Sequence, residues 1–191
     1  RVLAMDLHSA QIQGYFDIPC DHIYGSPVLI DYLESLNLEE VVVVSPDVGG
    51  VARARAFAKL MKDAPLAIID KRRAAHNIAE SLTVIGEVKG KTAILIDDMI
   101  DTGGTICSGA NLLKKEGANR IFACASHAVF SPPSYERLSA KNLFEQVIVT
   151  NSIPVIHKDN FPQLKVLSVA NMLGEAIWRI HEESSVSSMF R

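Results

Sequence analysis

The sequence has no apolar run approaching the ~20 residues of a membrane-spanning helix, and its first residues do not have the pattern of a signal peptide. It also lacks an excess of positive charge, because 19 Lys and Arg against 22 Asp and Glu give a net charge of −3. We therefore expect neither a membrane partner nor a nucleic-acid partner. The three cysteines, Cys20, Cys107 and Cys124, form no CxxC, which predicts reduced thiols and a cytoplasmic location.

The composition, with 48% hydrophobic and 21% charged residues over 191 positions, is typical of a globular protein with a sizeable core. The chain begins with Arg1, and Val2–Met5 already has the composition of a buried strand. We therefore expect further sequence upstream of this residue.

Short apolar runs alternate with segments of helical period along the whole chain. The runs predicted as strands are Val2–Met5, Val41–Val44, Leu66–Ile69, Thr92–Ile96, Ile121–Ala125, Gln146–Val149 and Lys165–Val169. The segments predicted as helices are Val28–Leu36, Val51–Met61, Thr105–Glu116 and Ala170–His181. This order, with strands rich in β-branched residues, predicts an α/β fold with a doubly wound, mostly parallel sheet. Ligands bind such sheets beyond the carboxyl ends of the strands.

One strand, Thr92–Ile96, is followed by paired carboxylates and then by a short Thr/Gly loop that leads into a helix. Glycines let the backbone approach an anion, and the first N–H groups of a helix attract phosphate. Carboxylates repel phosphate but accept hydrogen bonds from sugar hydroxyls, so the combination predicts a site for a phosphorylated ribose. The alternative is a strand-to-helix turn with capping aspartates. The predicted ribose 5-phosphate ligands are Asp97, Asp98, Asp101, Thr102, Gly103, Gly104 and Thr105.

This segment resembles the PRPP-binding signature of type I phosphoribosyltransferases and their relatives. The resemblance implies a sheet of the type I phosphoribosyltransferase kind. It does not separate enzymes that consume PRPP from the enzyme that makes it.

A second segment, Asp6–Asp21, makes that distinction. Read from its residues alone, it is a strand end followed by a polar loop, in which a single histidine, His8, is usually structural. The whole segment resembles the signature of the ribose-phosphate pyrophosphokinase (PRPP synthetase) family, which phosphoribosyltransferases lack. The resemblance continues to Ser185–Phe190 and favours the phosphate-regulated class. It implies a ribose-phosphate diphosphokinase that binds ATP and ribose 5-phosphate.

The loop Ser45–Gly50 follows the predicted strand Val41–Val44. Its glycines can cradle a diphosphate and Asp47 can bind Mg²⁺, although a Pro-Asp-x-Gly run is usually only a turn. The family resemblance implies that this is the pyrophosphate and ATP loop and that His8 and Asp47 share a Mg²⁺ site. The predicted pyrophosphate and ATP ligands are His8, Asp47, Val48, Gly49 and Gly50.

The basic run Lys71–Arg73 follows the predicted strand Leu66–Ile69 and enters a polar stretch, Ala74 to Ser81, that reads as a loop. Most basic triplets are solvated patches. The resemblance implies that this one begins the catalytic loop, with Lys71 and Arg73 as catalytic residues, because phosphoryl-type transfer depends on positioning and charge stabilisation.

The resemblance further implies a homo-oligomer, commonly a hexamer, with phosphate and ADP as effectors. It places Gln13, Asp21, Ser185, Ser187 and Phe190 at a regulatory site. We predict three parts: 1–25 as the end of an N-terminal synthetase domain, 26–170 as a phosphoribosyltransferase-like domain, and 171–191 as a C-terminal helix and tail.

Two other functions compete with this interpretation. A phosphoribosyltransferase would explain residues 97–105 but would leave Asp6–Asp21 without a role. A non-catalytic subunit associated with the synthetase should have a disrupted catalytic loop or altered metal positions, whereas Lys71, Arg73 and Asp47 are all present.

Overall fold

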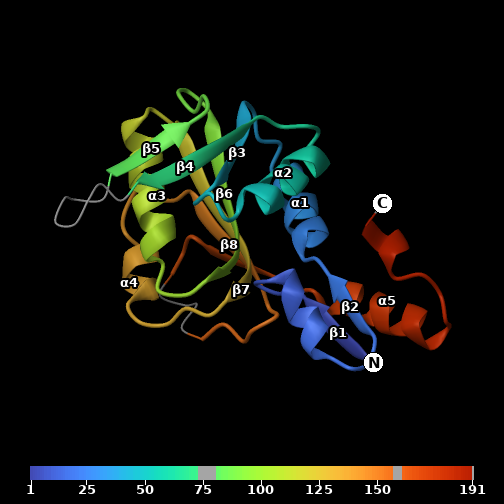
Figure 1. The fold of residues 1–191 in the computed structure, drawn as a ribbon. Helices are drawn as coiled ribbons and strands as arrows, with labels where there is room; N and C mark the ends of the chain where they lie inside the picture. Colours follow the sequence, from blue (N-terminus) through green and yellow to red (C-terminus); the bar gives the residue numbers. More distant parts are fainter. Residues whose placement is uncertain (73–80, 157–160, 191) are drawn as a thin grey trace.

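A seven-stranded sheet forms the centre of the molecule in the computed structural model, which describes residues 1–72, 81–156 and 161–190 (Figure 1). The strand order is β5-β4-β3-β6-β7-β8-β9, and the one antiparallel pair is β4 with β5. The strands are β3 (Val41–Ser45), β4 (Leu66–Arg72), β5 (Ser81–Ile85), β6 (Thr92–Ile100), β7 (Arg120–Ala128), β8 (Gln146–Thr150) and β9 (Leu164–Leu167). The prediction of a doubly wound, mostly parallel α/β sheet is confirmed.

Helices cover both faces of this sheet, which explains why its central strands are apolar on both sides. Alternate residues of β6 face opposite ways: Ile94 and Ile96 pack toward one pair of helices, while Ala93 and Leu95 pack toward the other. The first pair is α1 (Ser26–Ser35) and α2 (Val51–Leu60), and the second is α3 (Gly104–Lys115) and α4 (Ser134–Leu138) (Figure 1).

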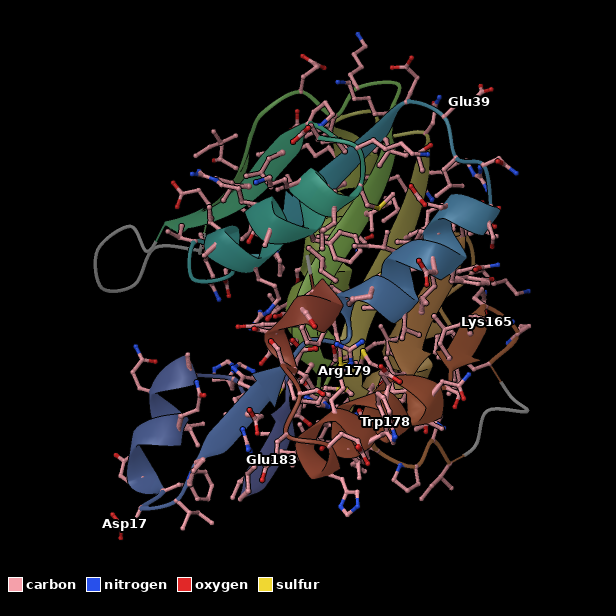
Figure 2. All side chains as sticks on the ribbon, turned by 90° about the vertical axis from the view of Figure 1, so that its right-hand side faces the viewer. Asp17, Glu39, Lys165, Trp178, Arg179 and Glu183 are labelled. Atoms are coloured by element: carbon pink, nitrogen blue, oxygen red, sulfur yellow. The ribbon has the colours of Figure 1, made fainter. Side chains whose placement is uncertain are left out.

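The two ends of the chain meet in a smaller unit beside the sheet, which we call the terminal unit. It consists of β1 (Val2–Met5), the 3-10 turn η1 (Ala10–Tyr15), β2 (Cys20–Ile23), α5 (Ala170–His181) and the 3-10 turn η3 (Ser187–Phe190). Strands β1 and β2 pair in parallel, and α5 lies next to them in both views (Figures 1 and 2). The unit has its own apolar cluster around Ile23, Ala176 and Val186. The three-part domain division stays a prediction.

The four predicted helices are present, and α5 has the predicted bounds. Five described elements were not predicted, namely β2, β5, α4 and the 3-10 turns η1 and η3. Five strands also end later than expected, β3 and β8 by one residue and β4, β6 and β7 by three or more. Strand β6 continues through Asp97 and Asp98 because it keeps pairing with β7 up to Ile100, and β4 reaches Arg72 because β5 pairs with its last residues.

Within the described residues, no helix is long and apolar enough to cross a bilayer. The three cysteines are free thiols, as predicted, and burial raises the pKa of both Cys107 and Cys124. Both buried thiols face the core clusters of the large sheet and behave as small apolar residues.

Candidate active site

Three predicted segments follow three neighbouring strands. Strands β4, β3 and β6 lie side by side and run parallel, so their carboxyl ends share one edge of the sheet. Lys71 is near the end of β4, and the loop that ends at Gly50 follows β3. The acidic pair lies near the end of β6, and the Thr/Gly loop follows that strand. The topology therefore brings the three segments to the edge where ligands bind in such folds.

The acidic pair Asp97 and Asp98 is held by an arginine from α2. Arg53 Nη1 lies 3.1 Å from Asp97 Oδ1 and 3.2 Å from Asp98 Oδ1, so one guanidinium bridges both carboxylates. The Asp98 amide also donates to Asp97 Oδ1 at 2.9 Å. Side-chain exposure differs sharply, at 23% for Asp97 and 1% for Asp98. One carboxylate is thus open to a ligand, while the other is buried behind it.

The two carboxylates have pKa values shifted in opposite directions. Burial, followed by the hydrogen bond and charge of Asp98, raises the pKa of Asp97 to about 7. Burial alone would also raise the pKa of Asp98, but Asp97, His8 and Arg53 together lower it. Below about pH 7, Asp97 is therefore the protonated member of the pair and Asp98 the ionised one. Such an arrangement can both donate to and accept from sugar hydroxyls.

His8 reaches this pair from the terminal unit. Its Nδ1 lies 2.8 Å from Asp98 Oδ2, while 73% of the imidazole side chain is exposed. Because ionised Asp98 is an acceptor, Nδ1 carries the hydrogen and Nε2 faces outward. Histidines that bind metals or phosphates are commonly oriented by a carboxylate in this way.

The Thr/Gly loop after β6, which we call the phosphate loop after its predicted ligand, contains a glycine in the left-handed backbone region. Gly103 has φ of +73°, and a Cβ there would lie 3.3 Å from Leu138 Cγ, so any other residue would be strained at this position. Arg137 of α4 donates from Nη1 to the Thr102 carbonyl at 3.1 Å. No side chain caps α3, although its cap residue and first turn are described in full. The alternative of a turn with capping aspartates therefore loses its support.

The loop between β3 and α2 is tightly wound. Asp47 Oδ1 accepts from the Gly50 amide at 2.8 Å, and Ser45 Oγ donates to the Asp47 carbonyl at 2.7 Å. Val48 is 63% exposed. One Asp47 oxygen is thus used within the turn, which leaves Oδ2 as the oxygen that the predicted Mg²⁺ would contact.

The predicted catalytic residues lie partly outside the described part of the chain. Lys71 is an exposed residue of β4, whereas Arg73 and the predicted loop up to position 80 are outside the described residues; Ser81 begins β5. The described residues contain no group of three or more His, Cys, Asp and Glu side chains suited to a metal. Among these residues no contact joins His8 to Asp47, so their shared Mg²⁺ site stays a prediction.

The predicted regulatory residues all lie in the terminal unit. Ser185 Oγ and Ser187 Oγ are 3.0 Å apart, and Phe190 packs edge-on against Tyr24 with ring centroids 6.0 Å apart. Gln13 bonds to the Ala10 carbonyl, and Asp21 pairs with Arg1. Over the described residues, no contact joins Gln13 or Asp21 to the two serines, so the common regulatory site stays a prediction.

A cavity of about 720 Å³ adjoins Asp97, the exposed member of the acidic pair. Its walls come from α1, α2, the residues after β1 and the tail; they include His8, Arg53, Asp97, Phe57 and Phe190. Residues of the candidate active site and of the predicted regulatory tail therefore border the same space.

Two residues of this site, Arg53 and Arg137, were not found by sequence reasoning. Arg53 had a weak signal, because it stands three residues after the predicted pyrophosphate loop on the first turn of a helix. Arg137 had none, since α4 was not predicted. Asp6, the first residue of the segment Asp6–Asp21, is buried and bonded to other protein groups, so it does not face a ligand.

Comparison with known proteins identifies the family. The family model described as "Phosphoribosyl synthetase-associated domain" matches residues 72–191. This chain belongs to that family. The match includes the acidic pair, the Thr/Gly loop and the tail, so the predicted PRPP synthetase resemblance is confirmed.

Curated relatives agree over the entire chain. A ribose-phosphate pyrophosphokinase of Prochlorococcus marinus subsp. pastoris is 95% identical over 191 residues, covering 100% of this chain and 58% of the relative. Ribose-phosphate pyrophosphokinase 1 of Spinacia oleracea is 65% identical over 193 residues, covering 100% of this chain and 57% of the relative. The chain thus spans less than two thirds of the length of these relatives.

A solved structure supports the fold. The crystal structure of phosphoribosylpyrophosphate synthetase from Mycobacterium smegmatis matches with a TM-score of 0.86 at 43% identity. The match covers 95% of this chain and 59% of that one. It therefore includes both the large sheet and most of the terminal unit.

Proposed function

We propose that this chain takes part in the synthesis of PRPP, in which diphosphate is transferred from ATP to the C1 hydroxyl of ribose 5-phosphate and AMP is released. The observation that carries the proposal is the hydrogen bond of 2.8 Å between His8 and Asp98. It joins the synthetase-type segment Asp6–Asp21 to the ribose-phosphate segment. In a phosphoribosyltransferase, the segment Asp6–Asp21 would have no part in the site. The relatives reported above are named ribose-phosphate pyrophosphokinases.

In this proposal, the sugar phosphate binds at the Asp101–Thr105 loop, where backbone N–H groups of α3 face it. The ring hydroxyls bind the exposed carboxyl of Asp97, which donates when protonated and accepts when ionised, whereas Asp98, predicted as a second ligand, is buried behind it and bonded to His8 and Arg53. Arg53 offsets the negative charge that these carboxylates place near a phosphorylated ligand.

The reaction forms a bond between the C1 oxygen and the β-phosphorus of ATP, and it breaks the bond from that phosphorus to the oxygen bridging to the α-phosphate. The proton of the hydroxyl is lost, and AMP leaves. Lys71 and Arg73 stabilise the charge of the transferred group. Mg²⁺, when bound with ATP, would neutralise phosphate oxygens, with Asp47 as an oxygen donor and the outward Nε2 of His8 as a contact.

The finer parts of the proposal follow the family. They are ATP and ribose 5-phosphate as substrates, Mg²⁺ as cofactor, phosphate and ADP as effectors at the tail, a homo-oligomer that is commonly a hexamer, and a cytoplasmic location. The non-catalytic alternative is not favoured because Lys71, Asp47 and His8 are all retained.

The direct test is calorimetric titration of this chain with ribose 5-phosphate and then with MgATP. Asp101→Ala should abolish saturable sugar-phosphate binding. The matched control is Glu39→Ala, an exposed carboxylate at the opposite end of the molecule (Figure 2), and it should bind like the unsubstituted chain. A folded chain, verified by circular dichroism, that does not bind ribose 5-phosphate would contradict the proposal.

The catalytic assignment has its own test, in which AMP release is followed with both substrates present. The double variant Lys71→Ala with Arg73→Ala should lose roughly 10³-fold or more in rate, the range for a transition-state arginine. Lys59→Ala, an exposed lysine on α2, serves as the charge-matched control. A double variant that keeps the original rate would remove these residues from the mechanism.

A further inference from the structure

The terminal unit and the large sheet have separate apolar cores. The cluster around Ile23, Ala176 and Val186 is completed by residues of β1, α5 and the tail, and it includes no residue of the seven-stranded sheet. Apolar packing therefore does not fix how the terminal unit lies against the sheet. His8 belongs to the terminal side and Asp98 to the sheet, so other contacts must set the distance between them.

Asp6 makes the main polar link between the two cores. Its side chain, on a residue with 8% exposure, accepts from the Gly25 amide at 2.7 Å and from the Ser126 hydroxyl, both at Oδ2. Ser126 is on β7 and is 3% exposed. A Cβ at Gly25 would lie 2.8 Å from Ser126 Oγ, so this approach is closed to larger residues. The Asp6 backbone has φ of +41°, a region that costs about 1 kcal/mol or more and that these bonds maintain.

His127, the residue after Ser126, completes the link from the sheet side. Its Nε2 lies 3.1 Å from both the Met5 and the Asp6 carbonyl oxygens, so this nitrogen carries the hydrogen. Its Nδ1 lies 2.8 Å from Ser152 Oγ. The Asp6 side chain and the backbone carbonyls of Met5 and Asp6 are thus held by two consecutive residues of β7, Ser126 and His127.

We propose that Asp6 and Ser126, assisted by His127, are positioning residues that hold His8 in its hydrogen bond to Asp98. His8 is two residues beyond Asp6, a span of at most ~7 Å, so it follows any displacement of the anchor. A shift of ~1 Å would already break a hydrogen bond of 2.8 Å. The positioning of His8 does not depend on the proposed function. Only its relevance to catalysis rests on that function, in which His8 faces the phosphates of ATP.

The test measures the tautomer of His8 by nitrogen-15 NMR on the unliganded chain at mildly alkaline pH, where exposed imidazoles are neutral. His8→Asn assigns the signals. In the unsubstituted chain, the hydrogen should be on Nδ1, held by Asp98. Ser126→Ala should lose that preference and place the hydrogen mainly on Nε2. The matched control is Ser134→Ala, a buried serine on α4 whose hydroxyl has no partner among the described residues, and it should keep the Nδ1 form.

A second pair of variants separates the anchor from general stability. Asp6→Asn retains an oxygen that can accept from Gly25 and Ser126 and tolerates the positive φ, so it should keep the Nδ1 form. Asp6→Ala should lose it. A folded Ser126→Ala chain with the original His8 signature would overturn the proposal. Because no substrate is present, failure to bind ribose 5-phosphate would contradict the proposed function and leave this result unaffected.

Discussion

The large sheet and the terminal unit are stabilised by different means. Strands β3, β6, β7 and β8 lie between two apolar clusters that cover both faces. The terminal unit has one cluster with three buried apolar residues, and it meets the sheet through a few polar bonds. The sheet is therefore a rigid support for the acidic pair and phosphate loop, whereas the position of His8 depends on a small number of directional contacts.

The largest expected difference between the two regions is in the core of the sheet. Phe122 is fully buried on β7, so Phe122→Ala should lower the free energy of unfolding by about 3–5 kcal/mol. Urea unfolding measures this loss. Ile177→Ala, at a side chain on α5 that is 59% exposed, is the control and should change little. A loss below ~1 kcal/mol for Phe122→Ala would show that the sheet core does not dominate stability.

A core substitution in the terminal unit should act locally. Ile23 is fully buried, and Ile23→Ala should cost about 2–3 kcal/mol. Native-state hydrogen exchange should show faster exchange in β1, β2 and α5, with β6 and β7 unchanged. Equal loss of protection in both regions would mean that they unfold as one unit, against the comparison drawn above.

The acidic pair at the edge of the sheet should give an unusual dependence of stability on pH. Asp97 has a pKa of about 7 in the folded chain against an ordinary value of 3.8, so the folded state retains a proton that the unfolded state releases. This stabilisation is present below pH ~4 and is lost as pH rises through ~7, a change of about 2 kcal/mol between pH 5 and pH 8.

The pKa of Asp98 is shifted in the opposite direction. Its lowered pKa stabilises the folded state, and this stabilisation is lost only in more acidic solution. Asp97→Asn, which mimics the neutral acid, should flatten the curve between pH 5 and pH 8. Urea titrations at the two pH values provide the measurement. A wild-type chain that is more stable at pH 8 than the variant would contradict the raised pKa of Asp97.

The smallest expected effect on stability is in the phosphate loop. Gly103→Ala forces a side chain into a left-handed backbone and against Leu138, at a cost of about 1–2 kcal/mol. Sugar-phosphate affinity should fall by more than this stability loss suggests, because the loop backbone must move. Gly90→Ala is the control: that glycine also has a positive φ, of +75°, but a Cβ added there would meet no other atom within 4 Å. Equal ribose 5-phosphate binding by both variants would exclude the Gly103 loop from the site.

The same contrast explains what could be predicted from the sequence. The β-branched runs and their order predict the large sheet. The segment 97–105 allows a ribose 5-phosphate site to be predicted, because the strand, the carboxylates and the loop are contiguous in the sequence. The terminal unit joins residues near position 20 with residues near 180, and its strand β2 reads as a polar segment, Cys-Asp-His-Ile. Such long-range pairing leaves no local periodicity to detect.

The bridging role of Arg53 could not be predicted for a related reason. A helical arginine between Ala52 and Ala54 resembles any solvated residue until the packing of α2 over β6 brings it to the acidic pair. Likewise, the bond between His8 and Asp98 joins residues 90 positions apart. The ends of β4 and β6 were predicted too early in the sequence, because Asp and Lys are unfavourable strand residues. Pairing with β5 and β7 overrides that preference.

Trp178, on α5, is the one tryptophan of the chain, and its side chain is 56% exposed (Figure 2). Its fluorescence therefore reports on the terminal unit alone, while far-ultraviolet circular dichroism is dominated by the larger set of helices and strands. Two optical signals from the unlabelled chain can thus separate the unfolding of the two regions. During unfolding, an emission change that precedes the loss of ellipticity would indicate a state in which the sheet is folded and the terminal unit, with His8, is unfolded.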